Sequence, residues 1–264
     1  MKTPVLDHGY VQVVEAWGSD ARIIEAARMS TQKGFLGWGP SCSKCGIRMV
    51  VTDDGPSPAD YPRAEQRECE HDAKKPGDEN LLRYLYEHKH STPFEMAGLV
   101  VEVQAPIFVF REWHRHRTQS YAEMSARYEP LPDVNYVPTV ERLMASAKGT
   151  NKQAGTAKDA KELTEAGAVQ YQQMLRDLYE RDQALYESAL LSGVPKELAR
   201  VVLPVGRYSR MRASANLRNW LGFLTLRMDS GAQWEIRQYA NVVAEVLRAQ
   251  FPRTMELFDQ EARR

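Results

Sequence analysis

The feature of this sequence that most constrains its fold is the irregular order of strand-like and helix-like segments. Alternation of apolar and polar residues predicts short strands at 11–14, 99–103 and 208–215. Helical periodicity occupies segments between and after them, including a long one at 159–191. A doubly wound parallel sheet needs strict alternation of strands and helices. The pattern therefore predicts an α+β fold, in which a mixed or antiparallel sheet packs against long helices.

Helix boundaries are marked by residues that favour capping positions. The predicted N-caps are Ser19, Asp78, Asn216 and a capping box made by Ser230 with Gln233. Pro106 suits the first turn of a helix at 107–117, and Gly193 stands where a C-terminal cap belongs. These signals place the helices that flank the predicted strands.

A stretch of different composition interrupts the first third of the chain. Residues 34–77 are rich in Gly, Pro, Asp and Cys and show no apolar periodicity. Segments of this length without secondary structure are uncommon inside compact domains. We therefore interpret 34–77 as a long loop or small insertion in a single catalytic domain that spans residues 1–264.

All three cysteines lie in this insertion, and they allow two interpretations. Cys42, Cys45 and Cys69, together with His71, could supply three sulfurs and one imidazole to a structural zinc ion. The Cys-x-x-Cys half of the pattern is typical of zinc sites, whereas Cys69-x-His71 places two ligands unusually close. The alternative, which the spacing favours, is a loop with free thiols and no metal.

Charge and hydropathy exclude several classes of partner. The chain has 35 Lys and Arg residues and 35 Asp and Glu residues, so it lacks the basic field typical of proteins that bind nucleic acid. No apolar run approaches the roughly 20 residues of a membrane span, and the N-terminal segment lacks the apolar centre of a signal peptide. The odd number of cysteines fits a reducing compartment, so we expect a cytoplasmic protein.

The most unusual segment is 111–128, with the sequence REWHRHRTQSYAEMSARY. It holds four arginines, two histidines, two glutamates and two serines. Guanidinium groups match phosphate oxygens and carbonyl edges, so this cluster in a neutral protein indicates a phosphate-bearing ligand. The alternative is a solvated polar face, which the interleaved Trp113, Tyr121 and Tyr128 make less favourable.

These residues resemble the signature of the flavin-dependent thymidylate synthases. Arg115-His116-Arg117, seven further residues and Ser125 match that family's RHR-x7-S motif, which Glu123 and Arg127-Tyr128 extend. The resemblance continues in HSTPFE from His90, LARVVLP from Leu198, NLR from Asn216 and LRMDSGAQWE from Leu226. It covers nearly the whole chain outside the 34–77 insertion and a loop at 149–158.

The resemblance implies a fold, an assembly and a set of ligands. Members of the family resemble one another in a mixed α/β fold that assembles as a homotetramer with active sites shared between subunits. They bind FAD, NADPH, methylenetetrahydrofolate and a uridylate, and they methylate carbon 5 of the uracil. The resemblance therefore implies a methyltransferase of nucleotide biosynthesis that uses these cofactors.

Roles for individual residues also follow from the resemblance. Contacts to the flavin are implied for His90, Thr92, Glu95, Asn216 and Arg218, although a histidine near a helix end such as His90 is more often structural. Positions between flavin and nucleotide are implied for Arg115, His116, Arg117 and Glu123. Contacts to the nucleotide are implied for Glu112, Ser125, Ala126, Arg127 and Arg200, and Arg227 would face the uracil ring.

Arg227 is the residue that we expect to activate the base. Carbon 5 of uracil is a weak nucleophile, and it gains electron density when negative charge on the ring oxygens is stabilised. A guanidinium keeps its proton and can supply that fixed positive charge. The alternative for Arg227 is a helix-end arginine that the helix dipole favours. No cysteine lies near a motif, so a thiolate attack on carbon 6 has no obvious nucleophile.

Several residues depart from the family pattern. Glu112 stands where the family usually has Gln, Ala122 and Gly222 replace Asn, Gly231 replaces His, and Met96 replaces His. Loss of side-chain amides weakens or redirects a bound ring and makes room. Two interpretations follow, a thymidylate synthase with a looser site or a relative that also accepts UMP, as in polyoxin-type antibiotic biosynthesis.

Two further hypotheses belong to different functional classes. The first is a flavin-binding homologue that has lost catalysis through Ala122, Gly222 and Gly231. The second is a nucleic-acid-binding module that uses the RHR cluster, which the zero net charge disfavours.

Overall fold

The computed structural model describes residues 2–39, 41–44, 74–75, 77–145, 155 and 161–262. The chain divides into two compact units, each made of segments that are separated in the sequence. Unit 1 comprises Met1–Val13, Val101–Ala213 and Leu226–Val242, and unit 2 comprises Val14–Val100, Ser214–Thr225 and Val243–Arg264.

Five of the described strands form one antiparallel sheet in the order β1-β2-β5-β7-β6. Their bounds are Lys2–Val5 for β1, Gly9–Trp17 for β2, Gly98–Pro106 for β5, Ser120–Glu123 for β6 and Tyr208–Asn216 for β7. β1 and β2 form a hairpin in which Val5 pairs with Gly9. Buried and accessible residues alternate along β7, as expected for a strand with one packed face. The predicted α+β fold is confirmed.

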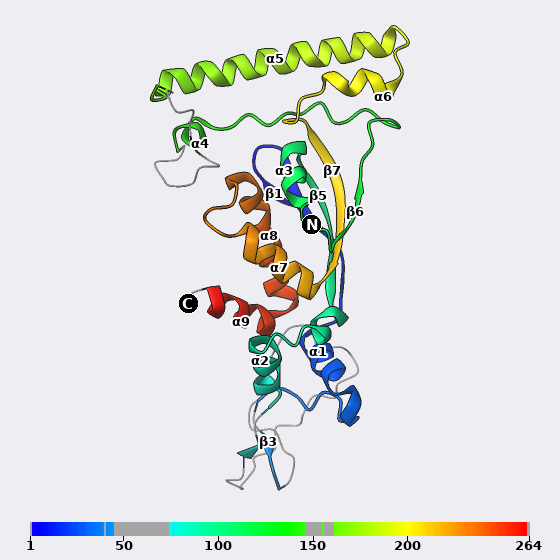
Figure 1. Ribbon diagram of the computed structural model, residues 1–264, viewed down its shortest axis with the longest axis vertical. Helices are drawn as coiled ribbons and strands as arrows, with labels where there is room; N and C mark the ends of the chain where they lie inside the picture. The colour runs from blue at the N-terminus through cyan, green and yellow to red at the C-terminus, as the bar shows by residue number, and fades with distance from the viewer. Residues whose placement is uncertain are drawn as a thin grey trace. The chain divides into compact units, whose positions relative to one another are not determined.

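Unit 1 carries the longest described helix, α5 (Glu165–Leu191). The short helices α4 (Val140–Met144) and α6 (Lys196–Ala199) pack against α5, and the 3₁₀ helix η3 (Arg200–Val202) follows α6 directly (Figure 1). α3 (Ile107–Trp113) begins where β5 ends at Pro106, a residue that suits a helix start. Its Val109, Phe110 and Trp113 are buried in the core of this unit.

Unit 2 contains α1 (Asp20–Ala27), α2 (Glu79–Glu87), the 3₁₀ helices η1 (Met29–Thr31) and η2 (Thr92–Met96), and α9 (Pro252–Ala262). α1 packs against η2, α2 and α9. The buried Asp20 carboxylate accepts hydrogen bonds from the main-chain N–H groups of Arg253 and Thr254, which lie in the first turn of α9. These bonds attach the start of α9 to the start of α1.

Two helices contribute residues to both units. They are α7 (Leu217–Arg227) and α8 (Trp234–Gln250). α7 directly follows β7, and the Asn216 side chain caps it by accepting a hydrogen bond from the Asn219 N–H at 3.0 Å. α8 ends just before Pro252, which opens α9.

Most of the sequence-based helix boundaries hold, and four need correction. Ser19 caps α1 as predicted, with its hydroxyl accepting from the Arg22 N–H at 3.2 Å. The helix predicted at 107–117 ends earlier, at Trp113. The helix predicted at 159–191 starts at Glu165, with Thr164 as its cap, while 159 and 160 lie outside the described residues. These shifts lie within the usual uncertainty of helix ends.

The other two corrections concern predicted caps. The Asp78 side chain does not cap α2; its buried carboxylate instead accepts hydrogen bonds from the Arg28 guanidinium and the Leu36 N–H. The capping box at Ser230 and Gln233 is also wrong, because α8 begins at Trp234. The Asp78 carboxylate bonds to Arg28 and to the main chain of Leu36, and the local sequence around Asp78 does not reveal these distant partners.

Only part of the 34–77 insertion is described. It includes the small two-stranded sheet of β3 (Ser41–Cys42) with β4 (Lys74–Lys75), where Cys42 is buried. Cys45, Cys69 and His71 lie outside the described residues. In the described ranges no group of three His, Cys, Asp or Glu residues is placed to hold a metal ion. None of the described helices is long and apolar enough to cross a membrane.

Candidate active site

The RHR segment follows the end of α3 in a turn that is fixed from several sides. The His116 N–H donates to the Trp113 carbonyl at 3.0 Å, and the Tyr121 hydroxyl donates to the carbonyls of Trp113 at 3.1 Å and His116 at 2.7 Å. The indole N–H of the fully buried Trp113 donates to Gln119 Oε1 at 3.0 Å. The main chain of the motif is therefore held in one conformation.

Arg227, the last residue of α7, bonds to this turn through three of its N–H groups. Its Nε donates to His116 Nε2 at 2.9 Å, Nη1 donates to Glu112 Oε2 at 2.7 Å and Nη2 donates to the Glu112 carbonyl at 2.8 Å. The guanidinium therefore bonds to the end of α3 and not to the carbonyls of its own helix. These contacts differ from those of an arginine that only interacts with the end of its own helix.

The electrostatics of this cluster favour a neutral imidazole. Burial, and then the Arg227 cation, lower the pKa of His116 from 6.5 to about 4, while the Glu112 carboxylate opposes the shift. At neutral pH the uncharged Nε2 can therefore accept the Arg227 N–H. Burial also raises the pKa of the Tyr121 hydroxyl to about 12, so it remains a hydrogen-bond donor.

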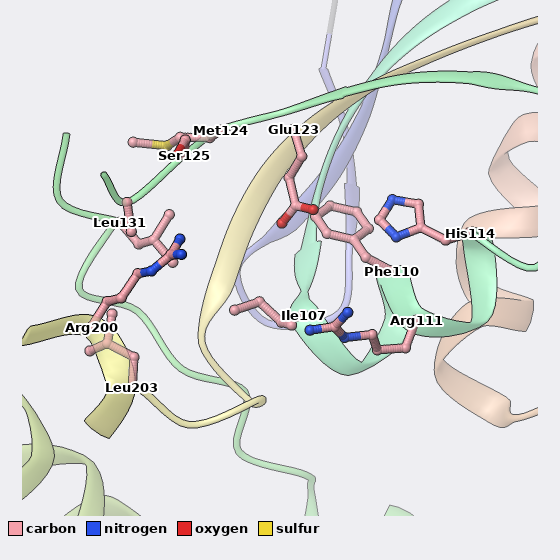
Figure 2. Close-up of a pocket in the computed structure, with 11 residues that line it drawn as sticks. Ile107, Phe110, Arg111, His114, Glu123, Met124, Ser125, Leu131, Arg200 and Leu203 are labelled. Carbon is pink, nitrogen blue, oxygen red and sulfur yellow. The ribbon is translucent and has the colours of Figure 1, made fainter. Parts of the chain in front are cut away.

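A cavity of about 380 Å³ in unit 1 brings together residues that lie far apart in the sequence (Figure 2). The predicted site residues that line it are Glu123, Ser125, Ala126 and Arg200. Glu123 ends β6, and the Met124 N–H after it bonds to the Arg210 carbonyl of β7 at 2.8 Å. Arg200 is the first residue of η3 and follows Ser125 by 75 positions in the sequence.

Sequence reasoning missed two polar residues of this cavity, Arg111 and His114. Arg111 lies on the face of α3 that includes Ile107 and Phe110, His114 directly follows α3 as its C-cap, and the four residues line the cavity together. Their spacing of i, i+3, i+4 and i+7 is the signal that would have found them. In Figure 2 the guanidinium groups of Arg111 and Arg200 extend into the cavity from opposite sides. Two guanidinium groups that extend into one cavity suit an anionic group.

The other predicted site residues of unit 1 do not line this cavity. Arg115, Arg117 and Arg127 have exposed side chains, and Arg127 Nε lies 3.5 Å from a Glu197 carboxylate oxygen. Glu112, His116 and Arg227 form the separate cluster described above. Within unit 1 the predicted residues therefore form two groups, one around the cavity and one around Arg227.

The predicted flavin residues belong to unit 2. Arg218 Nη1 donates to Glu95 Oε1 at 2.5 Å, and the side chains of Thr92 and His90 are exposed. A cavity of about 190 Å³ is lined by His90, Arg218 and further polar residues that include Lys89 and Glu261, by apolar side chains, and by the bare main chain of Gly222. A Cβ atom built on Gly222 would meet no atom within 4 Å. The replacement of Asn by Gly at this position therefore leaves open space.

Comparisons with known proteins show which family the chain belongs to. The family model described as thymidylate synthase complementing protein matches residues 12–253. A flavin-dependent thymidylate synthase of Thermotoga neapolitana is 33% identical over 258 residues, which cover 98% of this chain and 94% of that protein. An enzyme of the same name from Thermus thermophilus is 34% identical over 259 residues, which cover 97% of this chain and 78% of that protein.

Solved structures give a similar result. The UMP/dUMP methylase PolB from Streptomyces cacaoi bound with 5-Br UMP has a TM-score of 0.70 and 28% identity, and the match covers 97% of each chain. The same protein bound with 5-Br dUMP gives a TM-score of 0.69.

Proposed function

Because this chain belongs to the family of the flavin-dependent thymidylate synthases and is an enzyme, we propose that it methylates carbon 5 of a uridylate. The proposed one-carbon donor is methylenetetrahydrofolate, the reductant is NADPH and the flavin is FAD. The observation that carries the proposal is the cavity where Glu123, Ser125, Ala126 and Arg200 of two separate motifs meet.

The chemistry of this cavity suits a nucleoside monophosphate. Arg200 and Ser125 offer a guanidinium and a hydroxyl, which bind phosphate oxygens well. Apolar side chains such as Ile107 and Leu203 line the same space and can contact a sugar or a base. A volume of about 380 Å³ lies in the range of small-ligand sites. Exposed Arg127 extends the same loop and is proposed to contact the nucleotide from outside the cavity.

The residues of unit 2 fit part of a flavin. The cavity there combines the cationic Arg218, the imidazole of His90 and apolar walls beside an open main chain at Gly222. We assign His90, Thr92, Glu95, Asn216 and Arg218 to holding FAD, with Arg115, His116, Arg117 and Glu123 between it and the nucleotide. Bound flavin would supply the hydride that completes the methyl group.

Arg227 and its neighbours account for activation of the base. The guanidinium is held by Glu112 and by a neutral His116, so a fixed positive charge is available in one orientation. Such a preorganised cation stabilises negative charge that develops on the uracil oxygens during attack by carbon 5. His116 contributes by accepting an N–H without adding a second positive charge.

Assembly and substrate range complete the proposal. We propose a homotetramer with active sites shared between subunits, because α5 exposes the apolar side chains of Tyr171, Met174 and Leu178 in a single chain. We also propose that both dUMP and UMP are substrates, since Gly222 borders open space and Ala122 and Gly231 are smaller than the residues that the family usually carries there. A cytoplasmic location stays a prediction, as does the single-domain organisation.

A tritium-release assay tests the proposed function. The purified protein is expected to be yellow, to oxidise NADPH, and to release tritium from carbon-5-labelled dUMP and UMP when methylenetetrahydrofolate is present. Flavin binding without tritium release from either nucleotide would instead indicate a homologue that has lost methylation. Absence of flavin binding, by both absorbance and calorimetry, would overturn the proposal.

A further inference from the structure

Glu112 and the cavity lie on different sides of α3. Ile107, Phe110, Arg111 and His114 line the cavity (Figure 2). Glu112 is not among the residues that line it. A step of one residue turns a side chain by about 100° around a helix, which directs Glu112 to another face. A carboxylate would also repel the phosphate dianion of a nucleotide. The geometry therefore argues against a direct contact between Glu112 and the nucleotide phosphate.

The contacts of Glu112 are instead with Arg227. Its carboxylate accepts from Nη1 at 2.7 Å and its carbonyl accepts from Nη2 at 2.8 Å. The Arg227 side chain is 15% exposed, while that of Glu112 is 42% exposed. Glu112 thus holds a mostly buried guanidinium and keeps its plane fixed.

These contacts leave part of the guanidinium available. Of its five N–H donors, one bonds to His116 and two bond to Glu112, so within the described part of the chain two remain for a ligand. A guanidinium N–H can donate to a carbonyl oxygen such as that of a pyrimidine. The orientation of the remaining pair depends on the bonds that hold the other three.

We propose that Glu112 is a positioning residue that acts through Arg227 and fixes the two remaining N–H groups for the pyrimidine ring. This inference rests on the proposed function, and it reassigns Glu112 from nucleotide contact to orientation of the activating arginine. The carboxylate has a second, opposing effect, since its negative charge beside Arg227 weakens the field that the ring experiences. A glutamine keeps the acceptor and removes the charge, so it separates the two effects.

Kinetics of Glu112→Gln and Glu112→Ala provide the main test. We expect Glu112→Ala to lower kcat for methyl transfer roughly tenfold with the nucleotide KM within about twofold, because orientation matters most in the transition state. Glu112→Gln should retain kcat within about twofold or exceed it. The matched control is Glu256→Ala, which removes an exposed glutamate of α9 and should leave both constants unchanged. A rise in KM without loss of kcat in both Glu112 variants would overturn the proposal, as would an unaltered Glu112→Ala enzyme.

A second measurement needs no substrate and separates this inference from the proposed function. Hydrogen exchange of the Arg227 Nε–H can be followed by NMR, with the signal assigned by its disappearance in Arg227→Lys. Glu112→Ala should accelerate that exchange roughly tenfold, and Glu112→Gln should have a smaller effect. Unchanged exchange in Glu112→Ala contradicts positioning even if methylation is observed. Absent methylation in the parent protein contradicts the proposed function, while the exchange still tests the role of Glu112.

Discussion

Arg227 is the residue at which two parts of the proposed chemistry meet. It bonds to His116, proposed to lie beside the flavin, and to Glu112, which orients it. Its removal therefore has two separate consequences. A fixed cation is lost, and the Glu112 carboxylate loses the partner that stabilises its charge.

Replacing Arg227 tests whether this cation activates the base. We expect Arg227→Ala to lower the rate of methyl transfer by about 10²–10³, the usual effect of one electrostatic contact to a transition state. Arg227→Lys should restore only part of the rate, since an ammonium keeps the charge but lacks the planar fork. Flavin reduction by NADPH, measured under anaerobic conditions, should persist in both variants because it does not involve the pyrimidine. Loss of flavin binding in Arg227→Ala would make the residue structural, and the activating role would pass to Arg127 or Arg200.

The ionisation of His116 gives a second prediction at this scale. Its pKa of about 4 in the folded protein lies below the ordinary value of 6.5, so the unfolded chain takes up the proton first as the pH falls. The contribution of His116 to stability should therefore be intact above about pH 6.5 and decline between pH 6.5 and 4.

The NMR titration of His116 measures this pKa directly. In Arg227→Ala the pKa should rise toward its ordinary value, because both the neighbouring cation and part of the burial are removed. Arg210→Ala removes an exposed cation of β7 that makes no contact with His116 in the described structure and should leave the titration unchanged. A His116 that titrates near 6.5 in the parent protein would contradict the neutral-acceptor role.

At the scale of single elements, α7 carries a glycine in its interior. Glycine destabilises a helix because the unfolded chain gains conformational freedom. The bare main chain of Gly222 faces a cavity, and an added Cβ would meet nothing within 4 Å. The helix thus lacks a side chain at a position where sterics would allow one, which fits a role in leaving room for a ligand.

Gly222→Ala should therefore stabilise the protein. The expected gain is about 1 kcal/mol in the free energy of unfolding, measured by urea denaturation at matched flavin content. Gly18→Ala is the contrasting variant and should destabilise, since φ is +75° there and a Cβ would lie 2.7 Å from Ala97 Cα. Stabilisation without any change in flavin affinity would mean that Gly222 has no part in ligand binding. Destabilisation of Gly222→Ala would contradict the open geometry.

At the scale of the whole molecule, α5 leaves apolar side chains uncovered in a single chain. Tyr171, Met174, Leu178 and Leu185 are 46%, 60%, 43% and 55% exposed, and their spacing places them on one face of the helix. Ala168 and Tyr186 of the same helix are buried within unit 1. An uncovered apolar stripe of this kind is typical of a surface that another subunit covers.

Charges on this stripe should disrupt the proposed homotetramer. The double variant Met174→Glu, Leu178→Glu is expected to lower the mass measured by light scattering and to reduce methyl transfer, because the proposed active sites are shared between subunits. Val169→Glu changes an exposed apolar residue on another face of α5 and serves as the matched control. Retention of the parental mass by the double variant would show that the stripe is not an interface.

The sequence by itself determined several strands and helices and part of the candidate site. Apolar and polar residues alternate at 99–103 and 208–215 because one face of each strand is buried. This local pattern predicted β5 and β7 within a few residues. The cap at Ser19 is a local hydrogen bond, so local sequence suffices to find it. The motif residues Glu123, Ser125 and Arg200 were likewise identified from the chain alone, and the structure places them at one cavity.

Only the tertiary structure decided which side chains face one another. The carboxylate of Asp78 bonds to Arg28 and not to its own helix, because a partner 50 positions away offers a charge. Arg111 and His114 line the proposed nucleotide cavity, while Glu112, which lies between them in the sequence, bonds to Arg227, 115 positions away. Such choices depend on packing between distant segments, whose energies exceed those of local propensity.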